Sequence, residues 1–281
     1  MRNCSKALLA AALLCGAMPV MAQEREQSSV PQLAVMGTIP LVWGEAAGIE
    51  DILSGAAEPH WARSLIEQRA QLAPLDYLSA DALAPHTMLL LAQPRGLTGE
   101  ENVALDSWVR AGGRLLLFAD PMMTGESRFG LGDRRRPQDT VLLSPILNHW
   151  GLQLRFDDSQ AEGVRHSGFD GTQVPVNLAG EFAATGDGCT LEHHAVIARC
   201  TLGEGEVLAI ADSAMLDFHG PIEGAPEALF ALAAAIFPGF GDSAGNGPPI
   251  PHFVGESQSD TDGVSPSTMD EVTITGGIPP P

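Results

Sequence analysis

Residues 87–120 constrain the fold of this chain most, because they read as a strand, a helix and a second strand joined by short connections. Two apolar runs without polar alternation, residues 88–92 and 115–119, are each followed two positions later by a proline, Pro94 and Pro121. Apolar runs of this length are typical of strands that are buried on both faces of a sheet.

The residues between the two runs fit a helix with recognisable ends. Thr98 and Glu101 have the spacing of a capping box, in which each side chain accepts a hydrogen bond from the other residue's backbone amide. Leu105 and Trp108 then recur at helical spacing, and Gly112 with the next glycine supplies a left-handed stop. Together they predict a right-handed βαβ unit, and hence an α/β fold with a mostly parallel sheet and flanking helices.

The carboxyl ends of such strands are where open parallel sheets bind ligands. Asp120 ends the second apolar run, and Asp212, followed by Ser213, ends another run at residues 207–211. On neighbouring strands, the two carboxylates could converge on a metal, a hydroxylated ligand or a water. The structural alternative is that each aspartate caps the turn or helix that follows it, and the sequence leaves both alternatives open.

The glycine-rich residues 37–58 have few regular signals and are expected to form a loop over the strand ends. Within this loop, Trp43 and Glu45 join Asp120, Asp212 and Ser213 as candidate ligand-binding residues. The chain's four tryptophans are most simply core residues, and Trp43 stands out because its segment lies past a strand end.

The remaining elements are expected from apolar patterns and turn residues. Before the central unit they are a strand at 33–36, a helix that begins at Pro59, an extended piece at 74–78 and a helical turn capped by Ser79. The buried face of the helix that begins at Pro59 is expected to carry Trp61, Leu65, Ile66 and Leu72. After the central unit they are a helix capped by Ser144 and ended by Gly151, a strand at 152–156, an edge strand at 174–178, a β-hairpin of 195–198 with 207–211, and a helix from Pro226 to Phe237.

Three segments are expected along the chain. Residues 1–22 resemble a cleavable secretory signal, with a charged start, a short apolar stretch and small residues before the cleavage point. Residues 23–240 are expected to form one α/β domain, and residues 241–281 a disordered acidic tail rich in Gly, Pro and Ser. No second hydrophobic segment is long enough to span a membrane. The expected location is the periplasm, or the medium if the protein is secreted further.

Cleavage would leave two cysteines, Cys189 and Cys200. Two cysteines in an oxidising compartment suggest a disulfide, which here would close a hairpin or a loop. The alternative is two buried thiols.

The charge composition excludes several functions. Lys6 is the only lysine, so the mature chain offers no Schiff-base lysine, P-loop lysine or Ser-Lys dyad. The formal charge of the full chain is −20, and removal of Arg2 and Lys6 makes it −22. So acidic a chain is a poor candidate for binding nucleic acid or anionic lipid. The arginine run 134–136, in a long excursion at 121–140, reads as a solvated loop rather than a binding patch.

Other catalytic arrangements lack support. Asp217 and His219 could pair near Ser213, but no G-x-S-x-G elbow occurs for a hydrolytic triad. His193 and His194 are adjacent, so in a strand they would point to opposite faces and could not chelate together. The sequence has no set of residues with the spacing of zinc ligands, and no G-x-G-x-x-G motif follows a strand. Neither a metal nor a cofactor is therefore expected.

The order LLLAQP, T-x-E-E-x-x-A-L-D-x-W-V-x-x-G-G-R-L-L-L-F-A-D-P, N-H-W-G-L and G-E-G-E-V-L-A-I-A-D resembles the soluble domain of uncharacterised ABC-transport auxiliary proteins, which are similar to gliding-motility transporter components. The resemblance covers about residues 33–237 and implies a flavodoxin-like or class I glutamine-amidotransferase-like fold. It also implies a role beside a membrane transporter. Amidotransferase activity is not implied, because neither Cys189 nor Cys200 sits at a strand-end elbow.

The sequence therefore favours an exported, non-catalytic domain that binds a small ligand or an envelope protein partner, such as an ABC-type membrane component. An exported hydrolase that uses the strand-end aspartates is the alternative. The ligand, the partner and the oligomeric state are not specified by the sequence.

Overall fold

A computed structural model describes residues 30–46, 48–54, 58–216 and 220–241 of the chain. The predicted signal segment and nearly all of the predicted tail lie outside these residues. The described chain contains a seven-stranded sheet. Its strands are, in spatial order, β2 (Gln71–Pro74), β1 (Gln32–Gly37), β3 (Met88–Ala92), β4 (Arg114–Phe118), β11 (Gly205–Ile210), β10 (Ile197–Leu202) and β9 (Cys189–Glu192).

The sheet is mainly parallel, as the sequence predicts. The five strands from β2 to β11 pair in parallel, whereas β10 and β9 add to them in antiparallel fashion. All residues of β3 are buried, as are all but one in each of β4 and β11, which accounts for the unbroken apolar runs.

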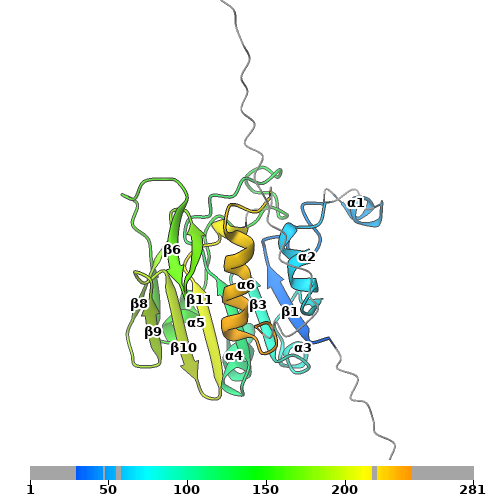
Figure 1. The fold of residues 1–281 in the computed structure, drawn as a ribbon. Coiled ribbons are helices and arrows are strands. Elements are labelled where there is room, and N and C mark those ends of the chain that lie inside the picture. Colours follow the sequence, from blue (N-terminus) through cyan, green and yellow to red (C-terminus); the bar gives the residue numbers. More distant parts are fainter. Residues whose placement is uncertain (1–29, 47, 55–57, 217–219, 242–281) are drawn as a thin grey trace, which may run out of the picture.

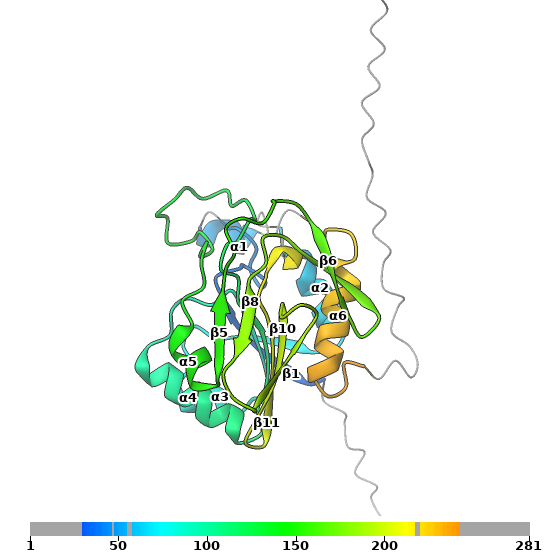
Figure 2. The same ribbon diagram turned by 90° about the vertical axis from the view of Figure 1, so that its left-hand side faces the viewer.

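Helices cover both faces of the sheet, which is seen edge-on between them in Figure 2, while Figure 1 shows the helices α2 and α6 in front of the strands. One face packs against α2 (Trp61–Glu67) and α6 (Ala225–Ile236). The other packs against α3 (Ala80–Leu83), α4 (Gly99–Arg110) and α5 (Ser144–His149). The chain runs from β1 to β2 through a helix on the first face, and from β3 to β4 through a helix on the second. The direction of strand addition therefore reverses between β1 and β3.

The central βαβ unit has the predicted helix ends. The Thr98 hydroxyl accepts from the Glu101 backbone amide at 3.2 Å, and the Glu101 carboxylate accepts from the Thr98 amide at 2.9 Å. Gly112, with a φ of 107°, follows the helix in the left-handed region. Glu101 is fully buried and also accepts from both terminal nitrogens of Arg95 and from the Leu78 amide.

Three predictions near residues 59–78 are wrong. The helix begins at Trp61, after His60, whose Nδ1 accepts from the Ala62 amide, so Pro59 precedes the helix. The helix ends at Glu67, and Leu72 lies in β2 rather than on the helix. The predicted extended piece at 74–78 therefore comes too late by a few residues. Within the predicted loop 37–58 there is also a short helix, α1 (Ile49–Ser54).

Most other differences between the predicted and the observed elements are short strands. Two antiparallel pairs, β5 (Leu152–Arg155) with β8 (Glu181–Ala184) and the hairpin β6 (Arg165–Phe169) with β7 (Thr172–Val176), flank the antiparallel end of the main sheet. The predicted edge strand 174–178 corresponds to β7. Ser144 is the first helical residue and not a side-chain cap, because no cap hydrogen bond forms there.

The segment at His193 and His194 is a turn and not the strand assumed from the sequence. His193, His194 and Ala195 have φ values of 50°, 57° and 64°, so three successive non-glycine residues are left-handed. This turn links β9 to β10, and the predicted hairpin partner therefore begins at Ile197 rather than Ala195.

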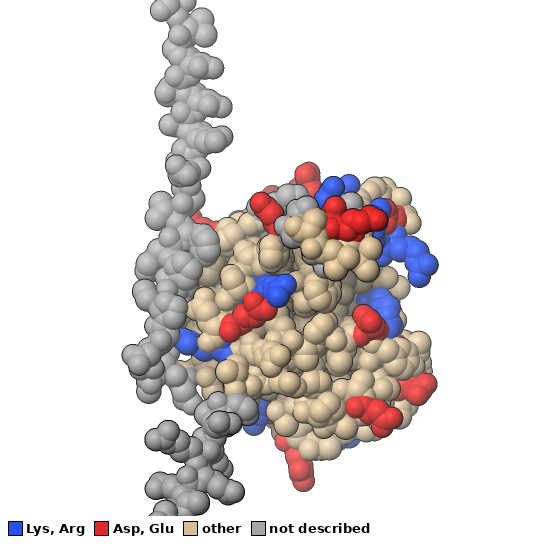
Figure 3. Space-filling model, turned by 90° about the vertical axis from the view of Figure 1, so that its right-hand side faces the viewer, with Lys and Arg blue, Asp and Glu red and all other residues tan. Residues whose placement is uncertain are grey.

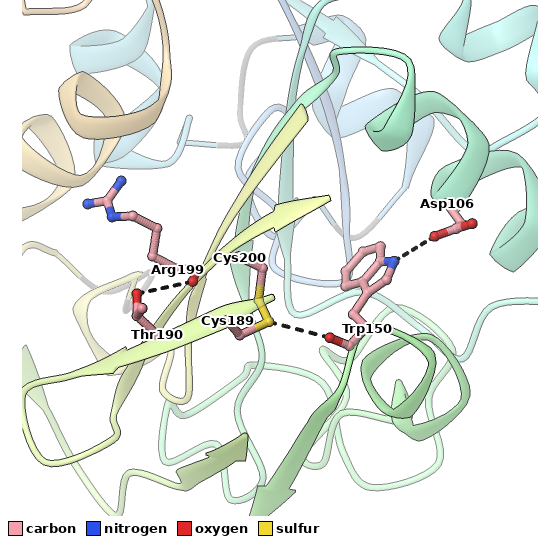
Figure 4. Close-up of a disulfide and its surroundings, with 6 residues drawn as sticks. All are labelled: Asp106, Trp150, Cys189, Thr190, Arg199 and Cys200. Carbon is pink, nitrogen blue, oxygen red and sulfur yellow. Dashed lines mark hydrogen bonds between the residues drawn. A yellow bond between two sulfur atoms is a disulfide. The ribbon is translucent and has the colours of Figure 1, made fainter. Parts of the chain in front are cut away.

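Cys189 and Cys200 are joined by a disulfide across this hairpin, where they are directly opposite in the register (Figure 4). The Cys189 Sγ atom also contacts the Trp150 carbonyl oxygen at 3.4 Å. Trp150 in turn donates from Nε1 to the Asp106 carboxylate at 2.9 Å. The antiparallel end of the sheet is thereby fastened to α4 and α5.

Throughout the described ranges, no helix has the length and apolar character needed to cross a bilayer.

Candidate functional site

Asp120 and Asp212 follow the parallel neighbours β4 and β11, so the two strand ends that carry them lie side by side. Asp120 Oδ1 accepts from the Met122 amide at 2.8 Å. Its Oδ2 accepts from the Ser213 amide at 2.9 Å and from the Ser213 hydroxyl at 2.8 Å. Asp120 and Ser213 therefore tie the two strand ends together.

The oxygens of Asp212 are occupied in the same way. Oδ1 accepts from the Ala214 amide at 2.7 Å, and Oδ2 accepts from the Asn177 amide at 2.9 Å. Asp212 thus fixes η1 (Ala214–Leu216) and the segment that follows β7. Each aspartate also accepts a hydrogen bond from the amide two residues further along the chain, Met122 for Asp120 and Ala214 for Asp212, as is typical of an Asx turn.

Burial changes the titration of this pair. Desolvation raises the pKa of Asp120 to about 6, against the hydrogen bonds from Ser213 and Met122. Burial and the nearby charge of Asp120 raise the pKa of Asp212 well above its usual value. Such shifts occur at functional sites and also in structural networks.

The surroundings of Asp120, Asp212 and Ser213 favour the structural alternative. All three residues are at most 2% exposed, and each carboxylate oxygen already accepts a backbone amide. Within the described ranges, no group of three or more His, Cys, Asp and Glu side chains is arranged to hold a metal ion. Asp217 and His219 lie outside the described residues.

Trp43 and Glu45 lie beyond the end of β1, beside a hollow of about 320 Å³. Trp43 is 51% exposed, so the expectation that the tryptophans are core residues is wrong for it. Glu45 holds the 121–140 segment: its carboxylate accepts from the Ser127 hydroxyl and, at 2.9 Å, from the Arg128 amide. Its side chain is therefore an anchor for the loop over the strand ends.

A larger hollow of about 500 Å³ lies above the ends of the parallel strands β1 and β3, where the direction of strand addition reverses. Doubly wound sheets bind ligands at this position. We call it the switch-point pocket. It is lined by Thr38, Arg95, Gly132, Asp133, Arg134, Arg136, Pro137, Gln138 and Asp139.

Gln93 follows β3 and is bonded to two residues, Thr38 and Gln138, that line this pocket. It is fully buried and left-handed, with a φ of 49°. Its Nε2 donates to the carbonyls of Asp120 and Gln138, each at 2.9 Å, and its Oε1 accepts from the Asp120 amide at 2.8 Å. One amide side chain thereby joins the ends of β3 and β4 to the loop at 121–140. Strained residues of this kind often accompany functional sites.

The ends of β1 and β3 approach closely. A Cβ atom on Gly37 would lie 1.9 Å from the Ala92 carbonyl oxygen, so no side chain fits there. Thr38 next to it donates from its hydroxyl to the Gln93 carbonyl at 2.5 Å and accepts from the Gln138 amide at 3.0 Å. The loop is therefore held over the strand ends by hydrogen bonds that leave the Gln138 side chain free to line the pocket.

The switch-point pocket is not among the sites that the sequence predicts. The available signal was the position of Thr38 and Gln93 directly after two buried strands. The arginine run 134–136 lies in a loop, as expected, and there Arg134 and Arg136 line the pocket, while Arg135 lines the Trp43 hollow. On the face drawn in Figure 3, charged side chains are scattered and both signs occur together along the upper rim.

A family model described as a domain of unknown function (DUF4350) matches residues 60–247. No curated protein matches the chain.

Several solved structures are distantly similar. They include an exo-β-1,4-mannosidase, Op5Man5 from Opitutaceae bacterium strain TAV5, at 13% identity and a TM-score of 0.39, covering 68% of this chain and 32% of that one. The mmIFT52 N-terminal domain has 13% identity and a TM-score of 0.43, covering 70% and 93%. A cold-adapted β-galactosidase from Rahnella sp. R3 has 16% identity and a TM-score of 0.40, covering 73% and 31%. The chain thus spans about a third of the length of the two glycosidases.

Proposed function

Because the chain belongs to the DUF4350 family of unknown function, we propose its role from its own geometry: an exported, non-catalytic α/β domain that binds a small ligand in the switch-point pocket. The observation that carries this proposal is a hollow of about 500 Å³ over the ends of β1 and β3, lined mainly by charged and polar residues of the anchored loop at 132–139. Its size falls within the usual range for small-molecule sites.

A flavodoxin-like or class I glutamine-amidotransferase-like fold belongs to the same proposal. The order β2-β1-β3-β4-β11 corresponds to the 2-1-3-4-5 order of flavodoxin-like sheets, with the additional strands at one edge. This correspondence supports the placement of the ligand between β1 and β3.

A periplasmic or secreted location, and a role beside an ABC-type transport system, complete the proposal. The disulfide between Cys189 and Cys200 is consistent with an oxidising compartment. The transport role rests on the sequence resemblance. The exposed Trp43 and Ile49 beside the smaller hollow favour an envelope protein as a second binding partner. For the hydrolase alternative, the occupied oxygens of Asp120 and Asp212 offer no access to a substrate.

The test is hydrogen-exchange mass spectrometry on the mature protein with and without a small-molecule fraction from its own cells. We expect slower exchange in residues 93–95 and 132–139. Gln138→Trp should abolish this protection, because its side chain fills the pocket while the backbone bonds of residue 138 remain. Gln71→Trp, on an exposed position of the edge strand β2, is the matched control. Protection elsewhere, or equal protection in Gln138→Trp, would contradict the proposed site.

The transport role has its own measurement, a crosslinked pull-down of the tagged mature protein from whole envelopes. We expect enrichment of permease or ATPase subunits, and recovery of the bait alone would count against a membrane partner.

A further inference from the structure

We infer that the ligand of the switch-point pocket carries a compact anionic group, a phosphate or a carboxylate, and that Arg134 and Arg136 bind it. This inference rests on the proposed ligand-binding function and adds the chemical class of the ligand. Arginine side chains are the usual partners of both groups, because the planar guanidinium matches two oxygens at once.

The charges around the pocket do not cancel. Arg95 is paired with the buried Glu101 at 2.7 Å, and Arg136 with Asp139 at 2.9 Å. The third acidic neighbour, Asp133, is bound at 2.7 Å by Arg135, whose side chain belongs to the other hollow. Every carboxylate at the pocket is therefore already matched by an arginine.

Arg134 is the cation left over. It lines the pocket, is exposed, and makes no hydrogen bond or ion pair with any other described residue. The pocket thus carries one uncompensated positive charge in a chain with a formal charge of −20. A cationic ligand would meet no free carboxylate there, and an anionic ligand would meet a free guanidinium.

Arg136 provides a fixed donor beside it. Its Nη1 donates to the Phe129 carbonyl at 3.0 Å and its Nη2 donates to Asp139 at 2.9 Å, which holds the guanidinium in place. Its Nε is buried and has no hydrogen-bond partner. A buried N–H without an acceptor is unfavourable, and a ligand oxygen in the pocket would satisfy it.

Gln138 adds a second unpaired polar group. Its Oε1 atom is buried without a partner, although its backbone amide and carbonyl are both bonded. A carboxamide offers either an acceptor or, with its two ends exchanged, a pair of donors. It can therefore bind a hydroxyl of the ligand or another oxygen of the anion. Three polar groups at the pocket are therefore available to a ligand: the Arg134 guanidinium, the Arg136 Nε and the Gln138 amide.

The test is isothermal titration of the mature protein with pyrophosphate, with citrate and with uncharged sorbitol, each at low salt. We expect one of the two anions to bind and sorbitol not to bind. Preferential binding of pyrophosphate identifies a phosphate ligand, and preferential binding of citrate a carboxylate ligand. Affinity should fall with added salt, because the pocket is partly open to solvent.

Arg134→Gln is the decisive variant, because Arg134 has no described partner whose loss could unfold the loop. It should weaken anion binding about tenfold or more, the effect expected for one charged hydrogen bond. Arg110→Gln is the matched control: it removes the same charge from an exposed ion pair at the far end of α4 and should leave affinity unchanged.

Arg136→Gln, checked for folding by its thermal transition, should weaken binding in the same direction. Unchanged affinity in Arg134→Gln, equal losses in Arg134→Gln and Arg110→Gln, or binding of sorbitol alone would overturn the inference. Pocket protection by an uncharged cellular compound in the exchange experiment would leave the proposed function standing while refuting the anionic ligand. If no cellular compound slows hydrogen exchange at the pocket, both the proposed function and the anionic ligand are refuted.

Discussion

At the scale of single residues, Asp120 shows how a strand-end carboxylate can be a structural group at a place where ligands are expected. Three donors, the Met122 amide and both polar hydrogens of Ser213, point at its two oxygens in a fully buried setting. A ligand could reach these oxygens only by displacing bonds that hold the two strand ends together. Asp120 therefore stabilises the fold at a strand position where ligand-binding aspartates are expected, and the neighbouring pocket remains available for binding.

We predict that Asp120→Ala destabilises the protein and spares the pocket. Loss of the carboxylate leaves the buried amide and hydroxyl of Ser213 without an acceptor. This should cost about 2 kcal/mol or more of unfolding free energy. Urea unfolding at neutral pH measures the loss. Asp187→Ala, at an exposed position, is the control and should have little effect.

Pyrophosphate or citrate affinity of the folded Asp120→Ala protein should equal that of the parent. A variant that unfolds at the parental urea concentration yet no longer binds would return Asp120 to the list of ligand-binding residues.

Residue-level expectations from the sequence are reliable where the cause is local. The Thr98–Glu101 capping box depends on two residues three positions apart, and both bonds form. The pocket depends on Thr38, Gln93 and Gln138, which are brought together only when β1, β3 and the loop after β4 meet. No local pattern specifies that meeting.

At the scale of elements, prediction succeeds for the buried parallel strands and the long helices. β3, β4 and α4 each carry a strong pattern of their own. β2, β6, β8 and β9 have four or five residues each with mixed burial, and their pairing partners lie far along the chain or across a turn. Such strands exist because a neighbour supplies the hydrogen bonds, which the sequence of the strand itself does not reveal.

We predict that the disulfide in the β9–β10 hairpin stabilises the protein. Its disulfide closes a turn in which His193, His194 and Ala195 are all left-handed, a conformation that costs energy at non-glycine residues. Replacing both cysteines by serine should lower the unfolding free energy by about 3 kcal/mol, the amount expected from chain entropy for a loop of this length.

Urea unfolding with and without a reducing agent measures this effect. The parent should lose stability on reduction, while the Cys189→Ser, Cys200→Ser double variant should not respond. Equal stability of the oxidised parent and the double variant would mean that the disulfide constrains nothing in this hairpin.

At the scale of the whole molecule, two buried acidic groups should give stability opposite dependences on pH. Hydrogen bonds from Arg95, Thr98 and Leu78 outweigh the effect of burial on Glu101 and lower its pKa to about 2. Asp120, by contrast, has its pKa raised to about 6 by burial. One group therefore favours the folded state when ionised and the other when protonated.

The signs follow from proton binding. Between about pH 4 and 6 the folded state holds a proton on Asp120 that the unfolded chain has lost, so stability falls as the pH rises through this window. A difference of about two pKa units corresponds to about 3 kcal/mol. Glu101 acts in the other direction: its contribution is complete above about pH 4.5, the unfolded value, and is lost as the pH falls toward 2. Stability should therefore be greatest near about pH 4 to 5 and decline on both sides.

Urea unfolding from pH 3 to 8 tests this profile, and two variants separate its limbs. In Asp120→Asn, Asp212→Asn the buried pair no longer titrates, so the decline from about pH 4 to 6 should disappear while the acid limb stays. In Glu101→Gln the acid limb should flatten while the decline toward neutral pH remains. A parent profile that rises steadily from about pH 4 to 6 would show that Asp120 and Asp212 are ionised without penalty in the folded state. Their burial beneath the loops would then not govern their titration, and their role as purely structural groups would need to be reconsidered.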